Sequence, residues 1–189
     1  MAINGNKIKL FTTDSFTTEK IKESSANWSS SPENKAMTGR YHKGDENGDT
    51  NYTYSFIYQD DQSITTENHK WSDWVQESGK KSKGLSEFIC PLNTVITGRE
   101  HSGDENGETR YRYSEIFIDG VPCATYNNHW SAEKKESSGE WALAKNCEVM
   151  TGRRHEGDEN GQSKYQFSSI GVSPTVTDSV KVNKAEHYV

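Results

Sequence analysis

Arginine, histidine, aspartate and glutamate occur together in one short segment at three places in the chain. Each segment reads Thr-Gly-Arg-x-His-x-Gly-Asp-Glu-Asn-Gly, beginning at Thr38, Thr97 and Thr151, and a tyrosine follows each. Carboxylate and amide oxygens accept hydrogen bonds, Arg and His donate them, and a Tyr ring offers a flat apolar face. This combination is typical of a small polar ligand site, and it suits the hydroxyls and C–H faces of a sugar.

We therefore predict one ligand-binding site per segment, built from six residues. The predicted residues are Arg40, His42, Asp45, Glu46, Asn47 and Tyr52; Arg99, His101, Asp104, Glu105, Asn106 and Tyr111; and Arg153, His155, Asp158, Glu159, Asn160 and Tyr165. Neighbouring positions vary between the copies, for example Tyr41, Glu100 and Arg154, so the repeated residues carry information.

Two other interpretations remain open. In the first, the segments are structural: Asp, Asn and Gly form a turn, the Arg bridges a carboxylate, and the His braces the hairpin. In the second, alternating oxygen ligands hold calcium, through Asp45, Asn47, Asp104, Asn106, Asp158 and Asn160. The calcium hypothesis is weakened because the place of Asp49 is taken by Gln162 in the third copy. No other cofactor is expected.

Catalysis is disfavoured. Asp45 and Glu46 are adjacent, and adjacent side chains of an extended chain point to opposite faces. An enzyme also builds one active site from dissimilar parts of its chain, whereas here the whole set occurs three times. The sequence contains no nucleophile elbow, phosphate-binding loop or zinc-protease motif. We expect a protein that is not an enzyme.

The elements around these segments are predicted to be strands. Tyr52, Tyr54 and Phe56 alternate after the first segment, as do Tyr165 and Phe167 after the third, and such alternation is typical of half-buried strands. The Asn-Gly pair predicts a hairpin with a type I′ turn. Each segment is therefore expected to form the tip of a β-hairpin.

Self-similarity covers most of the chain, because the segments are offset by 59 and 54 residues. It predicts an all-β domain over 1–172 with repeats at about 1–58, 59–118 and 119–172. Closure with pseudo-threefold symmetry, trefoil-like or prism-like, would protect the sheet edges, and a linear β-repeat array is the alternative. Residues 173–189 match no repeat and are expected to form a closing strand or a flexible tail.

Composition narrows the function further. The chain has 189 residues and a net charge of −6, which disfavours nucleic acid and anionic membranes as partners. No apolar run would cross a membrane, and no signal-peptide core is visible, so a cytoplasmic location or release by a leaderless route is expected. Cys90, Cys123 and Cys147 are expected to be free thiols. Trp28, Trp71, Trp130 and Trp141 are predicted to anchor the core.

The resulting prediction is a carbohydrate-binding, lectin-like protein with three equivalent sites that binds multivalent glycans or glycoconjugates. Its general plan resembles that of three-repeat lectins as a class, but the segment itself matches no lectin motif we know. The alternatives are a structural or protein-interaction repeat module without a small-molecule ligand, and a calcium-binding repeat protein.

Overall fold

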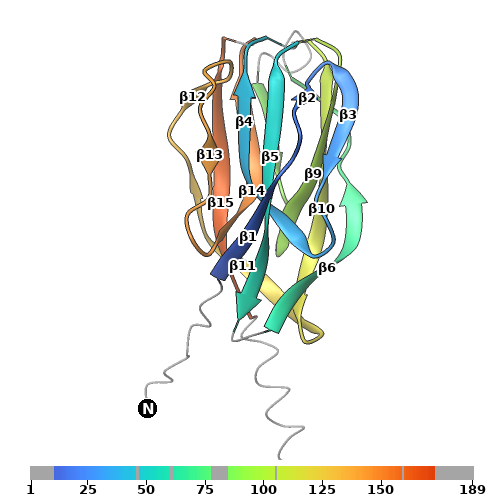
Figure 1. The fold of residues 1–189 in the computed structure, drawn as a ribbon, viewed down its shortest axis with the longest axis vertical. Helices are drawn as coiled ribbons and strands as arrows, with labels where there is room; N and C mark the ends of the chain where they lie inside the picture. The colour runs from blue at the N-terminus through green and yellow to red at the C-terminus, as the bar shows by residue number, and fades with distance from the viewer. Residues whose placement is uncertain are drawn as a thin grey trace, which may run out of the picture.

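In a computed structural model, the chain is built from β-strands that run along the long axis of the molecule (Figure 1). The structure describes residues 11–45, 47–59, 62–77, 85–104, 106–158 and 160–172, and this part contains no helix. The all-β class is therefore confirmed. Residues 173–189, predicted as a closing strand or tail, lie outside the described residues.

Three long antiparallel hairpins form the framework. They consist of β4 (Lys35–Lys43) with β5 (Asp49–Gln59), β9 (Thr94–Ser102) with β10 (Glu108–Ile118), and β14 (Glu148–Glu156) with β15 (Gln162–Val172). We call them hairpins 1, 2 and 3. Each has the predicted Gly-Asp-Glu-Asn-Gly sequence at its tip, so the predicted hairpins are confirmed.

The turn type was wrong. A type I′ turn needs positive φ at two central residues, but neither Asn106 nor Gly107 has one. The last paired residues of hairpin 2 are Ser102 and Glu108, so five residues form the loop. Positive φ occurs instead at the first glycine, Gly103, with φ 100°.

Further strands flank each hairpin. On one side lie β1 (Phe11–Thr17) and β2 (Ile21–Lys22) against β5, β6 (Gln62–Trp71) and β7 (Val75–Gln76) against β10, and β11 (Val121–Trp130) and β12 (Lys134–Lys135) against β15. These strands come from the same predicted repeat as the hairpin they extend.

The strand on the other side of each hairpin comes from a different repeat. β3 (Ser25–Ser30) pairs with β9 of hairpin 2, β8 (Leu85–Ile89) with β14 of hairpin 3, and β13 (Ala142–Leu143) with β4 of hairpin 1. Each repeat therefore lends a strand to the next, and the third lends one to the first. The hydrogen-bonded ladder from β13 to β8 remains open, because its two end strands are not paired with each other.

The glycine of each Thr-Gly-Arg segment allows this exchange. A Cβ on Gly98 would lie 2.6 Å from the backbone oxygen of Ser29 on β3, and one on Gly152 would lie 2.9 Å from that of Phe88 on β8. Real Cβ atoms do not approach this closely, so glycine is required where another backbone crosses. The threonine before it is buried; Thr97, for example, shares a hydrogen bond of 2.9 Å with Ser114.

The core is layered along the strands. At the end distant from the tips it is aliphatic, with Ala36, Val95, Val149, Ile57, Ile116 and Ile170 among its members. The next layer contains Met37, Ile96, Met150 and the aromatic rings of Tyr54 and Phe167. Arginine and then histidine follow in each hairpin as the tip is approached, so the predicted site residues border the core.

Candidate functional site

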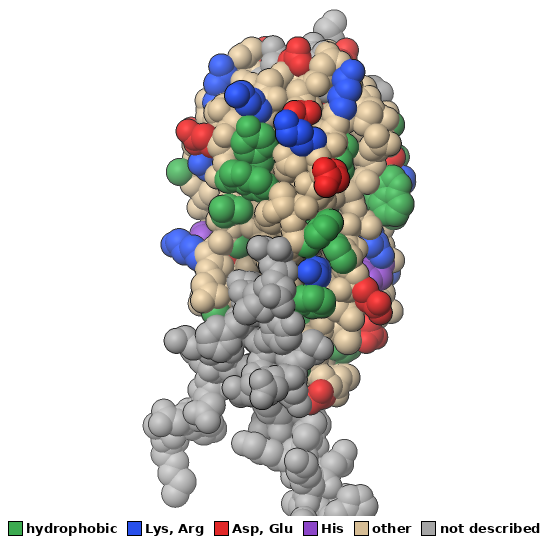
Figure 2. All heavy atoms as spheres, in the orientation of Figure 1, with side chains coloured by type: hydrophobic (Ala, Val, Ile, Leu, Met, Phe, Trp, Pro, Cys, Tyr) green, Lys and Arg blue, Asp and Glu red, His purple; other side chains and the backbone are tan. Residues whose placement is uncertain are grey.

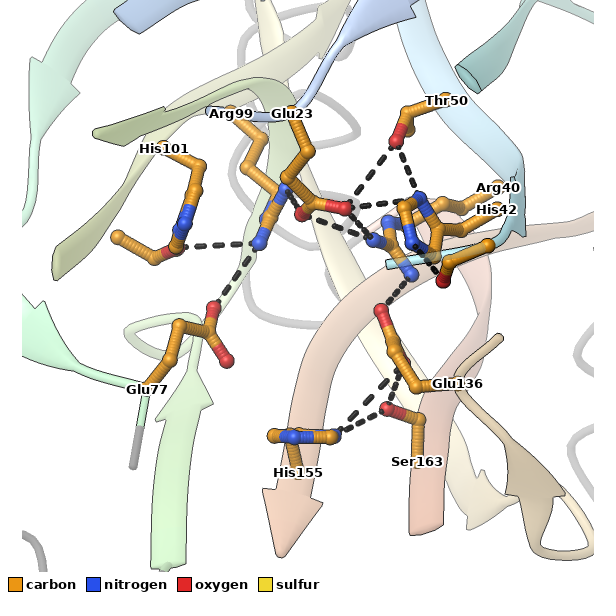
Figure 3. A network of polar contacts seen from close by, with 12 residues as sticks. Glu23, Arg40, His42, Thr50, Glu77, Arg99, His101, Glu136, His155 and Ser163 are labelled. Atoms are coloured by element: carbon orange, nitrogen blue, oxygen red, sulfur yellow. Dashed lines mark hydrogen bonds and ion pairs between the residues drawn. The ribbon is translucent and has the colours of Figure 1, made fainter. Parts of the chain in front are cut away.

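Three arginines and three glutamates alternate in a buried ring beneath the hairpin tips. Figure 3 shows the part of this ring that contains Arg40, Arg99 and the three glutamates. Each glutamate binds the arginines of two hairpins: Glu23 binds Arg40 and Arg99, Glu77 binds Arg99 and Arg153, and Glu136 binds Arg153 and Arg40. Arg99 Nη1 lies 2.5 Å from Glu23 Oε1, and Arg153 Nη1 lies 2.8 Å from Glu77 Oε2. The ring joins all three repeats through charge-assisted hydrogen bonds.

The tyrosine that follows each tip completes this ring from a neighbouring hairpin. Arg99 Nη1 donates to the hydroxyl of Tyr52 at 3.0 Å, and Arg40 Nη1 donates to that of Tyr165 at 2.9 Å. Arg153 and Tyr111 are related in the same way at 3.4 Å. The tyrosine rings therefore pack inside the protein, where they do not form walls of a surface site.

The charges of the ring stabilise one another. Burial alone would raise the pKa of Glu23 and Glu77, but the adjacent guanidinium groups outweigh burial and hold the pKa of both carboxyls well below the ordinary value. Burial likewise disfavours the charged form of Arg99, yet the surrounding oxygens raise its pKa above the ordinary value. All six groups are thus ionised and paired, as buried charges must be.

The histidines connect the ring to the tips. In hairpin 2, Arg99 Nη2 donates to Thr109 Oγ1 at 3.0 Å, and that hydroxyl lies 2.8 Å from His101 Nδ1. His101 Nε2 lies 3.3 Å from the carbonyl oxygen of Asp104 and donates to it, because a carbonyl can only accept. Burial, with a contribution from Arg99, lowers the pKa of His101. A neutral His101 therefore braces the tip from inside.

The tip residues themselves are held by local hydrogen bonds. The backbone N–H of Asn106 donates to Asp104 Oδ1 at 2.9 Å, and Asn47 and Asn160 do the same to Asp45 and Asp158. This is the aspartate turn expected of the structural interpretation. The aspartates and asparagines are exposed.

The predicted set is thus divided between the interior and the surface. Its arginines, histidines and tyrosines are at most 5 % exposed, so a ligand in solution does not reach them. Only the aspartates and asparagines of the tips are exposed, and Glu46, Glu105 and Glu159 lie outside the described residues. The arrangement places the donors of the predicted sugar site in the protein framework.

Sequence reasoning missed the three glutamates of the ring. The signal was present, because Lys22-Glu23-Ser24-Ser25 and Lys135-Glu136-Ser137-Ser138 are the same four residues, and Gln76-Glu77-Ser78 is a third version. Each glutamate lies 17 to 22 residues before the arginine of a segment. A carboxylate that recurs with a motif arginine predicts an ion pair, although it does not predict which hairpin provides the arginine.

The prediction that four tryptophans anchor the core is wrong for Trp28, whereas Trp71, Trp130 and Trp141 are half-buried. Trp28 on β3 is 57 % exposed, and Trp74, just after β6, is 38 % exposed. Trp71 at the end of β6 is half-buried, and its ring lies 6.1 Å from that of Trp28 in an edge-to-face arrangement. We call Trp28, Trp71, Trp74, Glu100 and Arg110 the tryptophan surface.

Arg110 on β10 organises this surface. Its guanidinium lies over the rings of both Trp71 and Trp74, at 4.7 and 4.6 Å from the ring centroids. On its other side, Nε and Nη2 lie 2.8 and 2.7 Å from Glu100 Oε2. Cation–π and ionic contacts therefore hold the arginine and two indole rings in one arrangement, while the arginine's charge is balanced by Glu100.

One face of the molecule is mostly polar. The face shown in Figure 2 has small groups of hydrophobic side chains separated by charged and other polar ones. Within the described ranges, no group of three or more His, Cys, Asp or Glu residues is arranged to hold a metal ion. The same residues include no helix long and apolar enough to span a membrane. Cys90, Cys123 and Cys147 form no disulfide among the described residues.

Comparison with protein-family models, with curated proteins and with solved structures found no match.

Proposed function

We propose that the chain is a non-catalytic carbohydrate-binding protein whose binding site is the tryptophan surface. The observation that supports this proposal is the exposure of Trp28 and Trp74 beside an Arg110–Glu100 pair. Exposed indole rings lose water when an apolar ligand face packs on them, and they are costly to expose without such a role. The adjacent guanidinium and carboxylate supply the donors and acceptors that sugar hydroxyls require.

The ligand class follows from charge. Arg110 is already paired with Glu100, so the surface offers no unbalanced charge to a sialic acid or uronic acid. A neutral pyranose with equatorial hydroxyls has flat C–H faces for the indoles and a polar edge for the charged pair. We therefore propose neutral, equatorially substituted oligosaccharides as ligands, with cellohexaose as the first probe.

The Thr-Gly-Arg-x-His-x-Gly-Asp-Glu-Asn-Gly segments have a structural role in this proposal. Their arginines close the ring with Glu23, Glu77 and Glu136, and their histidines brace the tips. The cyclic exchange of β3, β8 and β13 and the ring of charges both support a closed assembly with pseudo-threefold symmetry. Such a framework holds the tryptophan surface in a fixed geometry at low cost in conformational entropy.

A protein partner is the second candidate function. Trp and Arg are among the residue types that contribute most to the binding energy of protein–protein interfaces. The tryptophan surface contains three tryptophans and one arginine. A repeat module that binds another protein would use the same residues. The two functions predict different ligands for one surface, so a single set of variants tests both.

The test is a glycan array probed with the purified chain, with calcium and again with chelator. We expect binding to neutral oligosaccharides in both conditions, and a loss of about tenfold or more in affinity for Trp28→Ala with Trp74→Ala, since truncating a central aromatic costs about 2 kcal/mol. Leu92→Ala is the matched control, because Leu92 is 83 % exposed but lies in the turn between β8 and β9. A blank array in both conditions would overturn the proposal and favour a protein partner.

A further inference from the structure

The three hairpins agree in their buried residues but differ in the residues around them. Strand register identifies the positions that correspond on hairpins 2 and 3. Trp28 lies opposite Glu100 where β3 meets hairpin 2, whereas Glu87 lies opposite Arg154 where β8 meets hairpin 3. Hairpin 3 thus has a carboxylate in place of Trp28 and a guanidinium in place of Glu100.

The other side of hairpin 3 also differs from that of hairpin 2. Arg110 pairs with Glu100 across hairpin 2, and Lys164 occupies that place opposite Arg154. Trp130 pairs with Gln166 of β15, and Trp71 pairs with Arg112 of β10. Gln166 and Arg112 are equivalent positions of the two strands, so Trp130 corresponds to Trp71.

Three residues beyond Trp130, where hairpin 2 has Trp74, the chain has Glu133, which pairs with Lys164 at 2.8 Å. A shallow pocket lies there, lined by Glu133, Arg154, Glu156, Gln162 and Lys164. All of its lining residues are polar or charged, so Trp130 has no second indole beside it to pack on the face of a sugar.

Hairpin 1 differs in another way. Ala142 pairs with Arg40, so the preceding Trp141 falls opposite Tyr41, and the two rings pack against each other with centroids 5.4 Å apart. Asn51 occupies the place of Arg110. The place of Trp71 is taken by Thr17, which pairs with Thr53 of β5. Lys20, three residues beyond Thr17, takes the place of Trp74. Hairpin 1 therefore lacks the cation over two indoles and both tryptophans on the β1 side.

We infer that the chain carries a single oligosaccharide site, on hairpin 2, on a framework whose other two equivalent positions lack it. This inference rests on the proposed function and refines it. The internal repetition then serves the framework, because the ring needs three arginines and three glutamates to close. Avidity from three identical sites, expected from the sequence, is replaced by recognition at one surface.

Isothermal titration of the full chain with cellohexaose measures the number of sites. We expect one site per chain, and we expect Trp28→Ala with Trp74→Ala to abolish all binding. If the wild-type chain binds three molecules, or if the double variant still binds at one or more sites with undiminished affinity, the inference is overturned. Absence of any heat with the wild-type chain overturns the proposed function itself, which is a distinguishable result.

A gain-of-site variant tests the same inference in the opposite direction. Glu87→Trp, Glu133→Trp, Arg154→Glu and Lys164→Arg together would recreate the tryptophan surface on hairpin 3, where Trp130 is already in place. These positions are half-buried or exposed, so the framework should tolerate the changes. We expect the number of sites to rise from one to two; a folded variant that still binds one molecule would overturn the assignment of these five positions as the site. Circular dichroism shows whether this variant is folded. If the four changes prevent folding, the loss of cellohexaose binding in the Trp28→Ala, Trp74→Ala double variant decides the inference.

Discussion

Arg153 on β14 binds Glu77 across 76 residues of sequence, with Nη1 at 2.8 Å from both carboxylate oxygens. Both side chains are buried. Glu77 also binds Arg99, so it links the hairpins of two repeats. Because the same relation holds for Glu23 and Glu136, the tertiary contacts between repeats are ionic beneath the tips and apolar further along the strands.

Replacing one ring carboxylate tests how much the ring contributes to stability. In Glu77→Gln the shape is nearly kept, but Arg99 and Arg153 each lose one anionic partner while remaining buried. Breaking a buried ion pair from one side costs about 3–5 kcal/mol. We expect a loss of that size in the free energy of unfolding, measured by urea denaturation.

The matched control for Glu77→Gln is Glu108→Gln. Glu108 lies on β10 near the same tip, but its side chain is exposed, and exposed charges contribute little. We expect its substitution to change stability by less than about 0.5 kcal/mol. Equal effects of the two substitutions would contradict the ring's role in holding the repeats together.

The hairpins could be predicted from the sequence because their signals are local. Alternation of Tyr52 with Tyr54 and the glycine-rich tip lie within a few residues of each other, and period-two patterns describe strands directly. The ring could not be predicted in the same way. It requires knowing that β3 crosses to β9, and pairing between distant segments leaves no periodic trace in one sequence.

The wrong prediction for Trp28 has a related cause. An indole is usually buried, so Trp28 was predicted to lie in the core. Its place on β3 faces away from that core because the adjacent Ser29 points inward, where its hydroxyl shares a 2.7 Å hydrogen bond with Tyr54. Only the strand pairing reveals which of the two neighbours is inside.

Acid should destabilise the protein in two steps. Burial lowers the pKa of His101 and His155, so the unfolded chain binds more protons as pH falls below about 6.5, the ordinary value for His. The ring arginines hold the pKa of Glu23 and Glu77 well below the ordinary value, so their stabilisation is complete above about pH 4.3 and is lost progressively below it.

Both steps have the same sign, since each group binds protons more weakly in the folded state. We expect the melting temperature to decline from pH 7 to 5 and to fall more steeply below pH 4.3, as measured by calorimetry at constant ionic strength. In Glu77→Gln the steeper step should be smaller. A melting temperature that is constant or rising between pH 7 and 3 would contradict the ionised, buried ring.

Gly98→Ala tests the strand exchange. The new Cβ would lie 2.6 Å from the backbone oxygen of Ser29, so β3 must move away from β9. Such overpacking costs about 1–3 kcal/mol. Because Trp28 lies on β3 and must move with it, we expect Gly98→Ala to weaken cellohexaose binding as well as to lower stability. Gly152→Ala, at the β8 crossing of hairpin 3, should lower stability without reducing the affinity for cellohexaose.

The tips give the sharpest separation between the sequence-based site and the tryptophan surface. Asp104→Ala removes the acceptor for the backbone N–H of Asn106. Loss of one exposed turn hydrogen bond costs about 0.5–1.5 kcal/mol, which would lower the melting temperature by a few degrees at most. If the tips are turns, Asp45→Ala, Asp104→Ala and Asp158→Ala combined should leave the affinity for glycans unchanged. Loss of binding in that triple variant, with a preserved fold, would return the ligand site to the hairpin tips and leave the tryptophan surface without its proposed role.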